Sequence, residues 1–110
     1  MFELMTAPRS GPPKRIATFE DPRVAAIAGY RRCRMYSAGS LADTDAQWAS
    51  VDHVENGERT TLLEFRRVSD KEGATLGVSV DTSPALGVDP EWFFHLEKTA
   101  DGQLLIQGPR

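Results

Sequence analysis

Cysteine is nearly absent from this sequence of 110 residues: Cys33 is the single one, which excludes an internal disulfide. Long apolar runs are missing as well, and none approaches the ~20 residues that a membrane-spanning helix needs. The first residues show neither the basic start nor the apolar block of a secretory signal peptide. We therefore predict a soluble chain without membrane association, and a cytoplasmic location is consistent with the lone thiol.

Short sequence motifs that are typical of catalytic and metal-binding sites are also missing. Cys33, His53 and His95 are the candidate metal ligands, and no two of them have the close spacing typical of zinc sites. The nucleophile motif Gly-x-Ser-x-Gly does not occur, and prolines occupy the segment 10–14, where a phosphate-binding loop needs amide donors. We predict no metal and no cofactor. The pattern favours a chain that is not an enzyme, although acid–base chemistry by an Asp or His on a strand stays open.

Charge is unevenly distributed along the chain, whose net charge is −3. Residues 1–36 contain seven Lys or Arg and three acids, whereas residues 37–110 contain six and thirteen, so the two parts carry +4 and −7. The simplest interpretation is a basic helix that packs beside an acidic sheet. Because the acidic part would repel a polyanion, the sequence argues against a nucleic-acid partner.

Helix- and strand-breaking residues separate the start of the chain from the rest. Prolines and a glycine gather at positions 8–13, which predicts a flexible N-terminal tail over residues 1–18. The remaining residues, 19–110, have the length and the hydrophobic content of a single globular domain.

The clearest helix signal runs from Asp21 to Tyr36. Asp21 is a good N-cap and Pro22 suits the first helical position, while the glycine within Ser37–Ser40 predicts the end of the helix. These residues therefore predict one main helix, placed before every strand-like run.

A step of 100° per residue divides this helix into an apolar arc and a polar side. Tyr30 and Cys33 fall in the apolar arc, and Gly29 falls on the polar side. Arg31 and Arg34 also fall inside the apolar arc, where an arginine must extend to solvent, find a carboxylate or face a cavity. We therefore expect Arg34, together with Tyr30, to matter most.

The rest of the chain alternates in the manner of β-strands joined by tight turns. Asn56–Gly57 and Asp101–Gly102 are typical hairpin turns, because these residue types tolerate a positive φ. Residues 41–54 stay open between a second helix and a first strand. The later strand-like runs are 59–68, 74–81, 91–98 and 103–107. The predicted fold is α+β, with one main N-terminal helix packed on a curved antiparallel sheet of about four or five strands.

Two of these strands carry apolar side chains on both faces. Leu63 and Phe65 alternate with Leu62 in one strand, and Phe93 lies opposite Trp92 in another. A sheet with one face in water should not show this pattern, so something covers the second face. The candidates are the N-terminal segment and another subunit, and the second of these predicts a homodimer or a protein partner.

The chain resembles a known group of proteins in its last hairpin and in the start of its helix. The matching residues are Trp92, Leu96, Lys98, Gly102 and Ile106 in the pattern Trp-x-x-x-Leu-x-Lys-x-x-x-Gly-x-x-x-Ile, with Asp21–Pro22 opening a helix that carries Tyr30. On these residues the chain is similar to the cystatin-like folds and, within them, to the nuclear transport factor 2-like group, which usually has more helices before its sheet. The resemblance implies a binding pocket, dimerisation through the open sheet face and, in some members, isomerase or cyclase chemistry on a small hydrophobic substrate.

Two functions from different classes follow. The first is a small non-enzymatic protein-interaction module that dimerises or docks through a sheet face. The second is a pocket protein that binds a small hydrophobic ligand, or an isomerase- or cyclase-like enzyme. The residues expected to contact the partner or the ligand are Tyr30, Arg31, Arg34, Trp48, His53, Trp92, Phe93 and His95.

Overall fold

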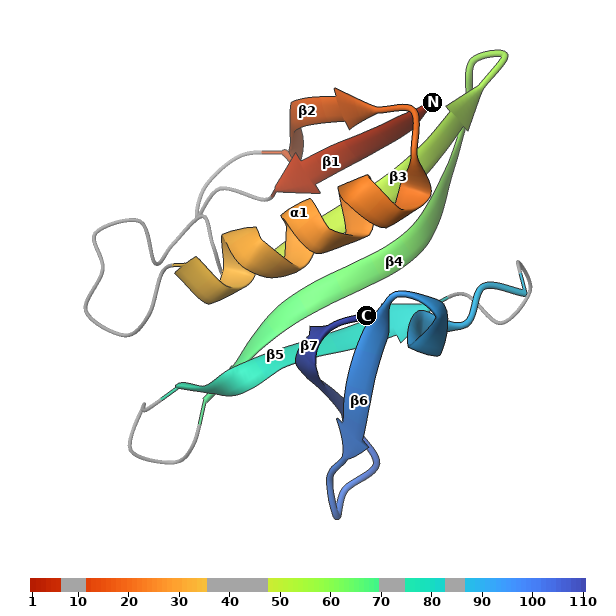
Figure 1. Cartoon of the computed structure of the whole chain (residues 1–110). Helices are drawn as coiled ribbons and strands as arrows, with labels where there is room; N and C mark the ends of the chain where they lie inside the picture. Colours follow the sequence, from red (N-terminus) through yellow and green to blue (C-terminus); the bar gives the residue numbers. More distant parts are fainter. Residues whose placement is uncertain (7–11, 36–47, 70–74, 83–86) are drawn as a thin grey trace.

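The computed structural model describes residues 1–6, 12–35, 48–69, 75–82 and 87–110. Within these residues the chain forms seven strands, one α-helix and one 3₁₀ helix (Figure 1). In chain order they are β1 (Phe2–Thr6), β2 (Lys14–Phe19), α1 (Pro22–Met35), β3 (Trp48–Glu55), β4 (Glu58–Ser69), β5 (Thr75–Thr82), η2 (Pro90–Trp92), β6 (Phe94–Lys98) and β7 (Leu104–Pro109).

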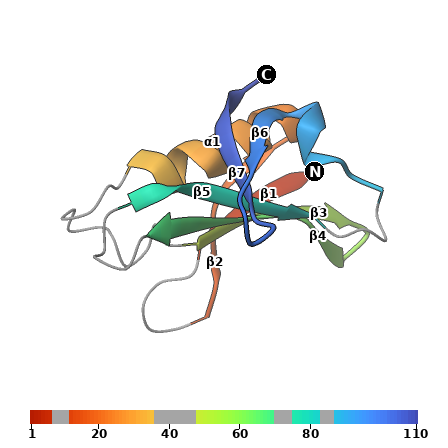
Figure 2. The same cartoon turned by 90° about the horizontal axis from the view of Figure 1, so that it is seen from below.

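All seven strands belong to one antiparallel sheet in the order β2-β1-β3-β4-β5-β7-β6. The helix α1 packs on one face of this sheet, over strands β1 to β5. Figure 2 shows α1 along one side of β3, β4 and β5, and the β6–β7 hairpin crossing these strands steeply. Because of this crossing, β7 pairs with β5 at one position, Ser79 with Leu105.

The expected sheet of about four or five strands is wrong, because the described residues contain seven. Two of the additional strands are β1, which lies in the segment 1–18 that the sequence predicted to be a tail, and β2, which begins in this segment and ends at Phe19. The breakers at positions 8–13 lie between these two strands, so they mark a connection and not a tail. Within the segment that stayed open, β3 begins at Trp48, and residues 36–47 lie outside the described part.

The predicted start of the helix is confirmed. The Oδ1 atom of Asp21 accepts a hydrogen bond from the amide of Arg23 at 2.8 Å, and the Asp21 carbonyl accepts one from Ala25 at 3.1 Å, as an N-cap does. The predicted stop at Ser37–Ser40 lies outside the described residues. With 14 residues, α1 is too short to span a membrane. None of the helices in the described part of the chain is long and apolar enough to do so.

The face that α1 turns to the sheet agrees with the predicted apolar arc at Tyr30 and Cys33, which are buried, and differs from it at other positions. Gly29, expected on the polar side, is buried, and a Cβ atom there would lie 2.6 Å from the Phe65 ring. Arg31 and Arg34, expected inside the apolar arc, are exposed. The helix approaches the sheet closely at Gly29, and a larger side chain there would collide with Phe65, so this close contact favours the orientation in which Gly29 faces the sheet.

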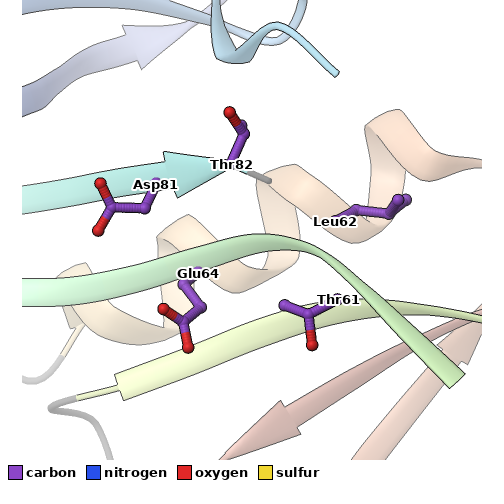
Figure 3. Close-up of a pocket in the computed structure, with 5 residues that line it drawn as sticks. All are labelled: Thr61, Leu62, Glu64, Asp81 and Thr82. Carbon is purple, nitrogen blue, oxygen red and sulfur yellow. The ribbon is translucent and has the colours of Figure 1, made fainter. Parts of the chain in front are cut away.

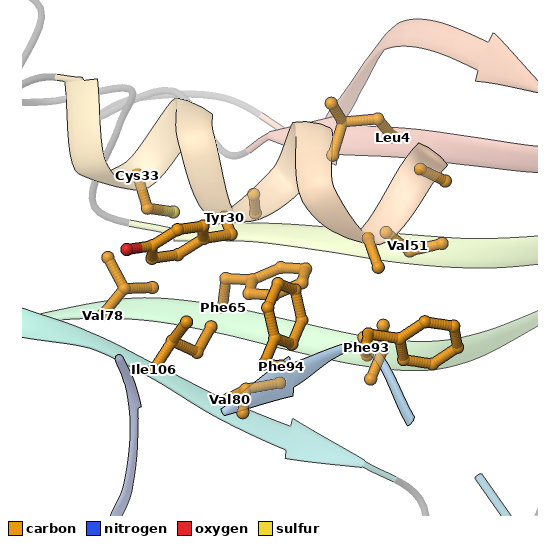
Figure 4. Close-up of a cluster of buried hydrophobic side chains, with 14 residues drawn as sticks. Leu4, Tyr30, Cys33, Val51, Phe65, Val78, Val80, Phe93, Phe94 and Ile106 are labelled. Atoms are coloured by element: carbon orange, nitrogen blue, oxygen red, sulfur yellow. The ribbon is translucent and has the colours of Figure 1, made fainter. Parts of the chain in front are cut away.

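The core lies between α1 and the sheet (Figure 4). The Phe94 ring is at its centre and packs edge-on against Tyr30 and Phe65, with ring centroids 5.6 and 5.9 Å apart. Aromatic pairs prefer this geometry. Cys33 is fully buried beside them, as expected of a small core residue, and its carbonyl accepts hydrogen bonds from the Arg67 guanidinium at 3.2 and 3.3 Å.

Two local features explain the strands that appeared apolar on both faces. In β4, Val51 pairs with Leu63 and Asp52 pairs with Thr61, so Leu62 is the additional residue of a β-bulge. The run predicted as a strand from residue 91 begins instead with η2, and β6 starts at Phe94. The expected second apolar face is therefore not required, because a bulge and a helical turn produce the same sequence pattern.

The predicted turn at Asn56–Gly57 is confirmed. Asn56 has φ 52° and Gly57 has φ 82°, which are the positive values that a two-residue type I′ turn requires. This turn joins β3 to β4 and fixes their register from the Glu55–Glu58 pair to the Asp52–Thr61 pair. The bulge then shifts the register by one residue, so that Val51 and Leu63 lie opposite each other in the core.

Candidate functional site

The three residues predicted on α1 do not share one site. Tyr30 is buried in the core, where its ring meets Phe94. The Arg34 guanidinium lies 5.9 Å from the Tyr30 ring centroid and is exposed, and Arg31 is exposed as well. Tyr30 and Arg34 therefore form a cation–π pair over the core, and they do not line a cavity together.

Trp48, His53 and His95 are scattered over the surface. The Trp48 indole donates to Glu64 at 3.3 Å on the face of the sheet opposite α1. The His53 ring stacks at a tilt on Phe2, with centroids 5.1 Å apart, and His95 is exposed on β6. These three residues lie in different places and form no common constellation.

Trp92 and Phe93 do line a common cavity, which we name the α1–η2 pocket. It is an open hollow of about 380 Å³ between the first turn of α1, the 3₁₀ helix η2 and the middle of β3 and β4. Its lining residues are Phe2, Pro22, Arg23, Val51, Leu62, Leu63, Val88, Trp92 and Phe93. All of them are apolar except Arg23. The pocket therefore has an apolar lining with one cationic side chain.

One wall of the pocket depends on the turn before β6. Asp89 caps η2 by accepting the Glu91 amide at 2.9 Å, and Pro90 occupies the first helical position. The turn leaves Trp92 55% exposed and buries Phe93, which packs against Phe94 in the core. In this pocket the Phe93 side chain is therefore held in place by the core, whereas the Trp92 indole is exposed at the rim.

The opposite wall depends on the bulge in β4. The extra residue, Leu62, turns a half-buried side chain into the pocket next to Leu63. Without the bulge, two consecutive residues of a strand would point to opposite faces of the sheet. The bulge is thus the reason why both leucines contribute to one cavity.

Arg23 ties α1 to the C-terminal part of the chain. Its Nη2 atom donates to the Trp92 carbonyl at 3.0 Å and its Nη1 atom to the main-chain oxygen of Arg110 at 3.4 Å. The guanidinium also lies 5.9 Å from the centroid of the Phe93 ring. These contacts hold a positive charge beside the apolar wall.

A second, polar hollow of about 230 Å³ lies against the same bulge (Figure 3). Two carboxylates on neighbouring strands, Glu64 and Asp81, form a cross-strand pair there, and Thr61 and Thr82 add hydroxyl groups. No three His, Cys, Asp or Glu of the described residues are arranged to hold a metal ion. This hollow therefore lacks the set of ligands that a metal site is built from.

Two buried carboxylates lie on the face of the sheet away from α1, together with the more exposed arginines that pair with them. We call Glu3, Asp52, Arg59 and Arg15 the ionic cluster. Arg59 donates to Asp52 at 2.9 Å and also to Glu3, which additionally accepts from Arg15 at 3.3 Å. The hydrogen bond from Arg59 holds the pKa of Glu3 below its ordinary value, against desolvation, which raises it.

Every oxygen in this cluster has a partner. The second oxygen of Asp52 accepts from Ser50 at 3.1 Å and from Thr61 at 2.9 Å, so neither oxygen is left to take a proton from a substrate. Burial raises the pKa of the Cys33 thiol to about 11, so this thiol keeps its proton near neutral pH and is a poor nucleophile. The ionic cluster and Cys33 therefore stabilise the fold.

Comparisons with known proteins find no match, since no family model, no curated protein and no solved structure matches this chain. The resemblance to the nuclear transport factor 2-like group stays a prediction. The α1–η2 pocket is thus identified as a candidate site by its geometry alone. Sequence reasoning identified two of its residues, Trp92 and Phe93, and missed the other seven.

Proposed function

We propose that this chain is a non-catalytic domain that binds a small apolar molecule in the α1–η2 pocket. The observation that supports this function is a hollow of about 380 Å³ whose lining is apolar apart from Arg23. Pockets for small molecules usually measure about 300–1,000 Å³, and they combine apolar walls with very few polar groups. The α1–η2 pocket has this size and this composition.

The same lining argues for binding without catalysis. Proton transfer needs a group that gains and loses a proton near neutral pH, such as a carboxylate or an imidazole. Arg23 is the ionisable residue of the lining, and a guanidinium keeps its proton throughout this range. The isomerase and cyclase chemistry implied by the resemblance therefore has no support in this pocket.

A protein partner or a homodimer stays a prediction. The argument for it was a second apolar face of the sheet, and that face instead carries buried polar residues such as Glu3, Ser50 and Asp52. An apolar pocket next to an exposed Trp92 supports a small ligand more directly.

The test is a fluorescence titration with 1-octanol as an apolar probe. Trp48→Phe removes the indole on the other side of the sheet and leaves Trp92, at the pocket rim, as the reporter. Burial of part of an eight-carbon chain, at about 0.8 kcal/mol per CH₂ and less the cost of association, gives a dissociation constant on the order of 0.1–1 mM. We expect a saturable shift of the Trp92 emission in this range.

Two matched valine substitutions locate the binding. Val88→Phe enlarges a side chain that lines the pocket, and we expect it to weaken binding at least fivefold because it occupies the space of the probe. Val24→Phe makes the same change at a residue of α1 that is 49% exposed and outside the lining, and binding should persist. A linear, non-saturating response, or equal effects of the two variants, would overturn the proposed function.

A further inference from the structure

The lining of the α1–η2 pocket is rich in aromatic rings. Phe2, Trp92 and Phe93 are three of its nine residues, whereas the whole chain of 110 residues contains five Phe, two Trp and two Tyr. These three rings come from β1, from η2 and from the residue that follows η2, and the fold brings them to one hollow. The pocket therefore presents ring faces and edges in addition to aliphatic surface.

Two of these rings already have aromatic partners within the chain. The Phe2 ring stacks at a tilt on His53, with centroids 5.1 Å apart, and the Phe93 ring packs edge-on against Phe94 at 6.4 Å. Both partners lie outside the lining. These contacts orient the two phenylalanine rings from behind, so a ligand meets aromatic walls that are already in place.

Trp92 differs from the other two rings because it has no such partner. Its indole is 55% exposed, more than any other aromatic residue of the described part of the chain. Among the described residues, no aromatic ring and no guanidinium lies against it. The largest aromatic side chain of the pocket is therefore the one available for stacking.

Resting on the proposed function, we infer that the ligand of the α1–η2 pocket carries a flat aromatic ring that stacks on Trp92. The ring enters the hollow that Phe2 and Phe93 also line. Aromatic pairs in offset or edge-on arrangements are more stable than the burial of their area alone explains. A saturated molecule of the same carbon skeleton would bury similar area without forming these pairs, so the pocket should discriminate between the two.

The experiment compares two alcohols of eight carbon atoms, 2-phenylethanol and 2-cyclohexylethanol. They share one carbon skeleton and differ in whether the ring is aromatic or saturated. Each association constant is measured by NMR titration of the backbone amides and is divided by the octanol–water partition coefficient of the probe, which corrects for hydrophobicity. On this corrected scale we expect 2-phenylethanol to be favoured about fivefold, the effect of a good aromatic pair.

The NMR signals of Trp92 report the stacking directly. In the Trp48→Phe variant, Trp92 carries the one remaining indole, so its ring resonances are identified without ambiguity. An aromatic ring stacked on this indole should move the resonances of its protons upfield through the ring current, and the saturated ring should not. Equal shifts with the two probes would contradict stacking on Trp92.

Matched substitutions assign the preference to the lining. Trp92→Leu should abolish most of it, and Phe2→Leu should lower it about twofold, because each removes a ring and keeps an apolar side chain. Phe19→Leu makes the same change at the half-buried residue that pairs with Phe2 across β1 and β2 but lies outside the lining, and the preference should remain. A preference that survives both lining variants, or that Phe19→Leu lowers equally, would overturn the inference.

The outcomes separate this inference from the proposed function. If both probes and 1-octanol bind but the corrected affinities of the two probes are equal, the aromatic ligand is wrong and the apolar pocket stands. If none of the three binds, both proposals fall. Should a lining variant fail to fold, visible as the loss of dispersion in its NMR spectrum, the corrected preference and the ring-current shift in the Trp48→Phe protein decide the question without it.

Discussion

The two faces of the sheet are built from opposite kinds of residue. The face toward α1 buries apolar side chains such as Leu63, Phe65 and Val80, and the α1–η2 pocket lies at its edge. The other face buries Glu3 and Asp52, whose charges are matched by arginines. One sheet can therefore be stabilised by the burial of apolar side chains on one face and by ion pairs on the other. The first face should be sensitive to the loss of core volume, and the second to the loss of a charge or to a change of pH.

The largest effect is expected on the apolar face. Phe65→Ala removes a fully buried ring that fills the space left by Gly29, and we expect it to lower the free energy of unfolding by about 3–5 kcal/mol. Urea denaturation followed by circular dichroism measures this loss. Val24→Ala, at an exposed position of the same layer, should change stability by less than about 0.5 kcal/mol. A loss below about 1 kcal/mol for Phe65→Ala would show that this face is not the main source of stability.

A smaller effect is expected when the ionic cluster is broken. Arg59→Ala leaves Glu3 and Asp52 buried side by side without their shared cation, but the Arg59 side chain is itself 45% exposed. We therefore expect a loss of about 2 kcal/mol, between the values for exposed and fully buried pairs. Arg66→Ala is the control, because its contact with Glu64 is 3.9 Å long and its side chain is 61% exposed. Equal losses for both variants would contradict a special role for the ionic cluster.

The smallest effect is a pH dependence that belongs to the charged face alone. The hydrogen bond from Arg59 keeps the folded-state pKa of Glu3 below 4.5, its ordinary value. The stability that the ion pairs supply is therefore fully present above pH 4.5 and is lost as the pH falls through the folded-state pKa.

Melting temperatures measured in this acidic range test the assignment. In Glu3→Gln, the melting temperature should fall less steeply as the pH is lowered below 4.5. Val80→Ala, on the apolar face, should lower the melting temperature at every pH and leave its slope with pH unchanged. An equally steep acid limb in Glu3→Gln would assign the pH dependence to other carboxylates.

Local features of the fold could be read from the sequence. Asp21 opens α1 and Asn56–Gly57 joins β3 to β4 because each depends on neighbours in the chain, so residue type is sufficient. Arg34 could not be placed in this way. Its orientation follows from the close approach of α1 to Phe65 at Gly29, a contact between distant segments, and Arg34→Ala should therefore matter less than expected.

The candidate site was predictable in part. Trp92 and Phe93 were expected because large aromatic residues are common in binding sites. Leu62 carried a usable signal, since adjacent leucines in an alternating strand also indicate a bulge. Arg23 and Val88 carried no such signal in the sequence. They lie together because the segment around η2 packs against the first turn of α1.

The position of β1 bears on the order in which the molecule assembles. β1 precedes the other described strands along the chain, yet in the finished sheet it lies between β2 and β3, with Phe2 opposite His53. During translation β1 and β2 can form a hairpin early, but one edge of that hairpin waits for a partner encoded in the middle of the chain. Such long-range pairing slows folding, and until β3 has been synthesised one edge of the hairpin stays open to pairing with other chains.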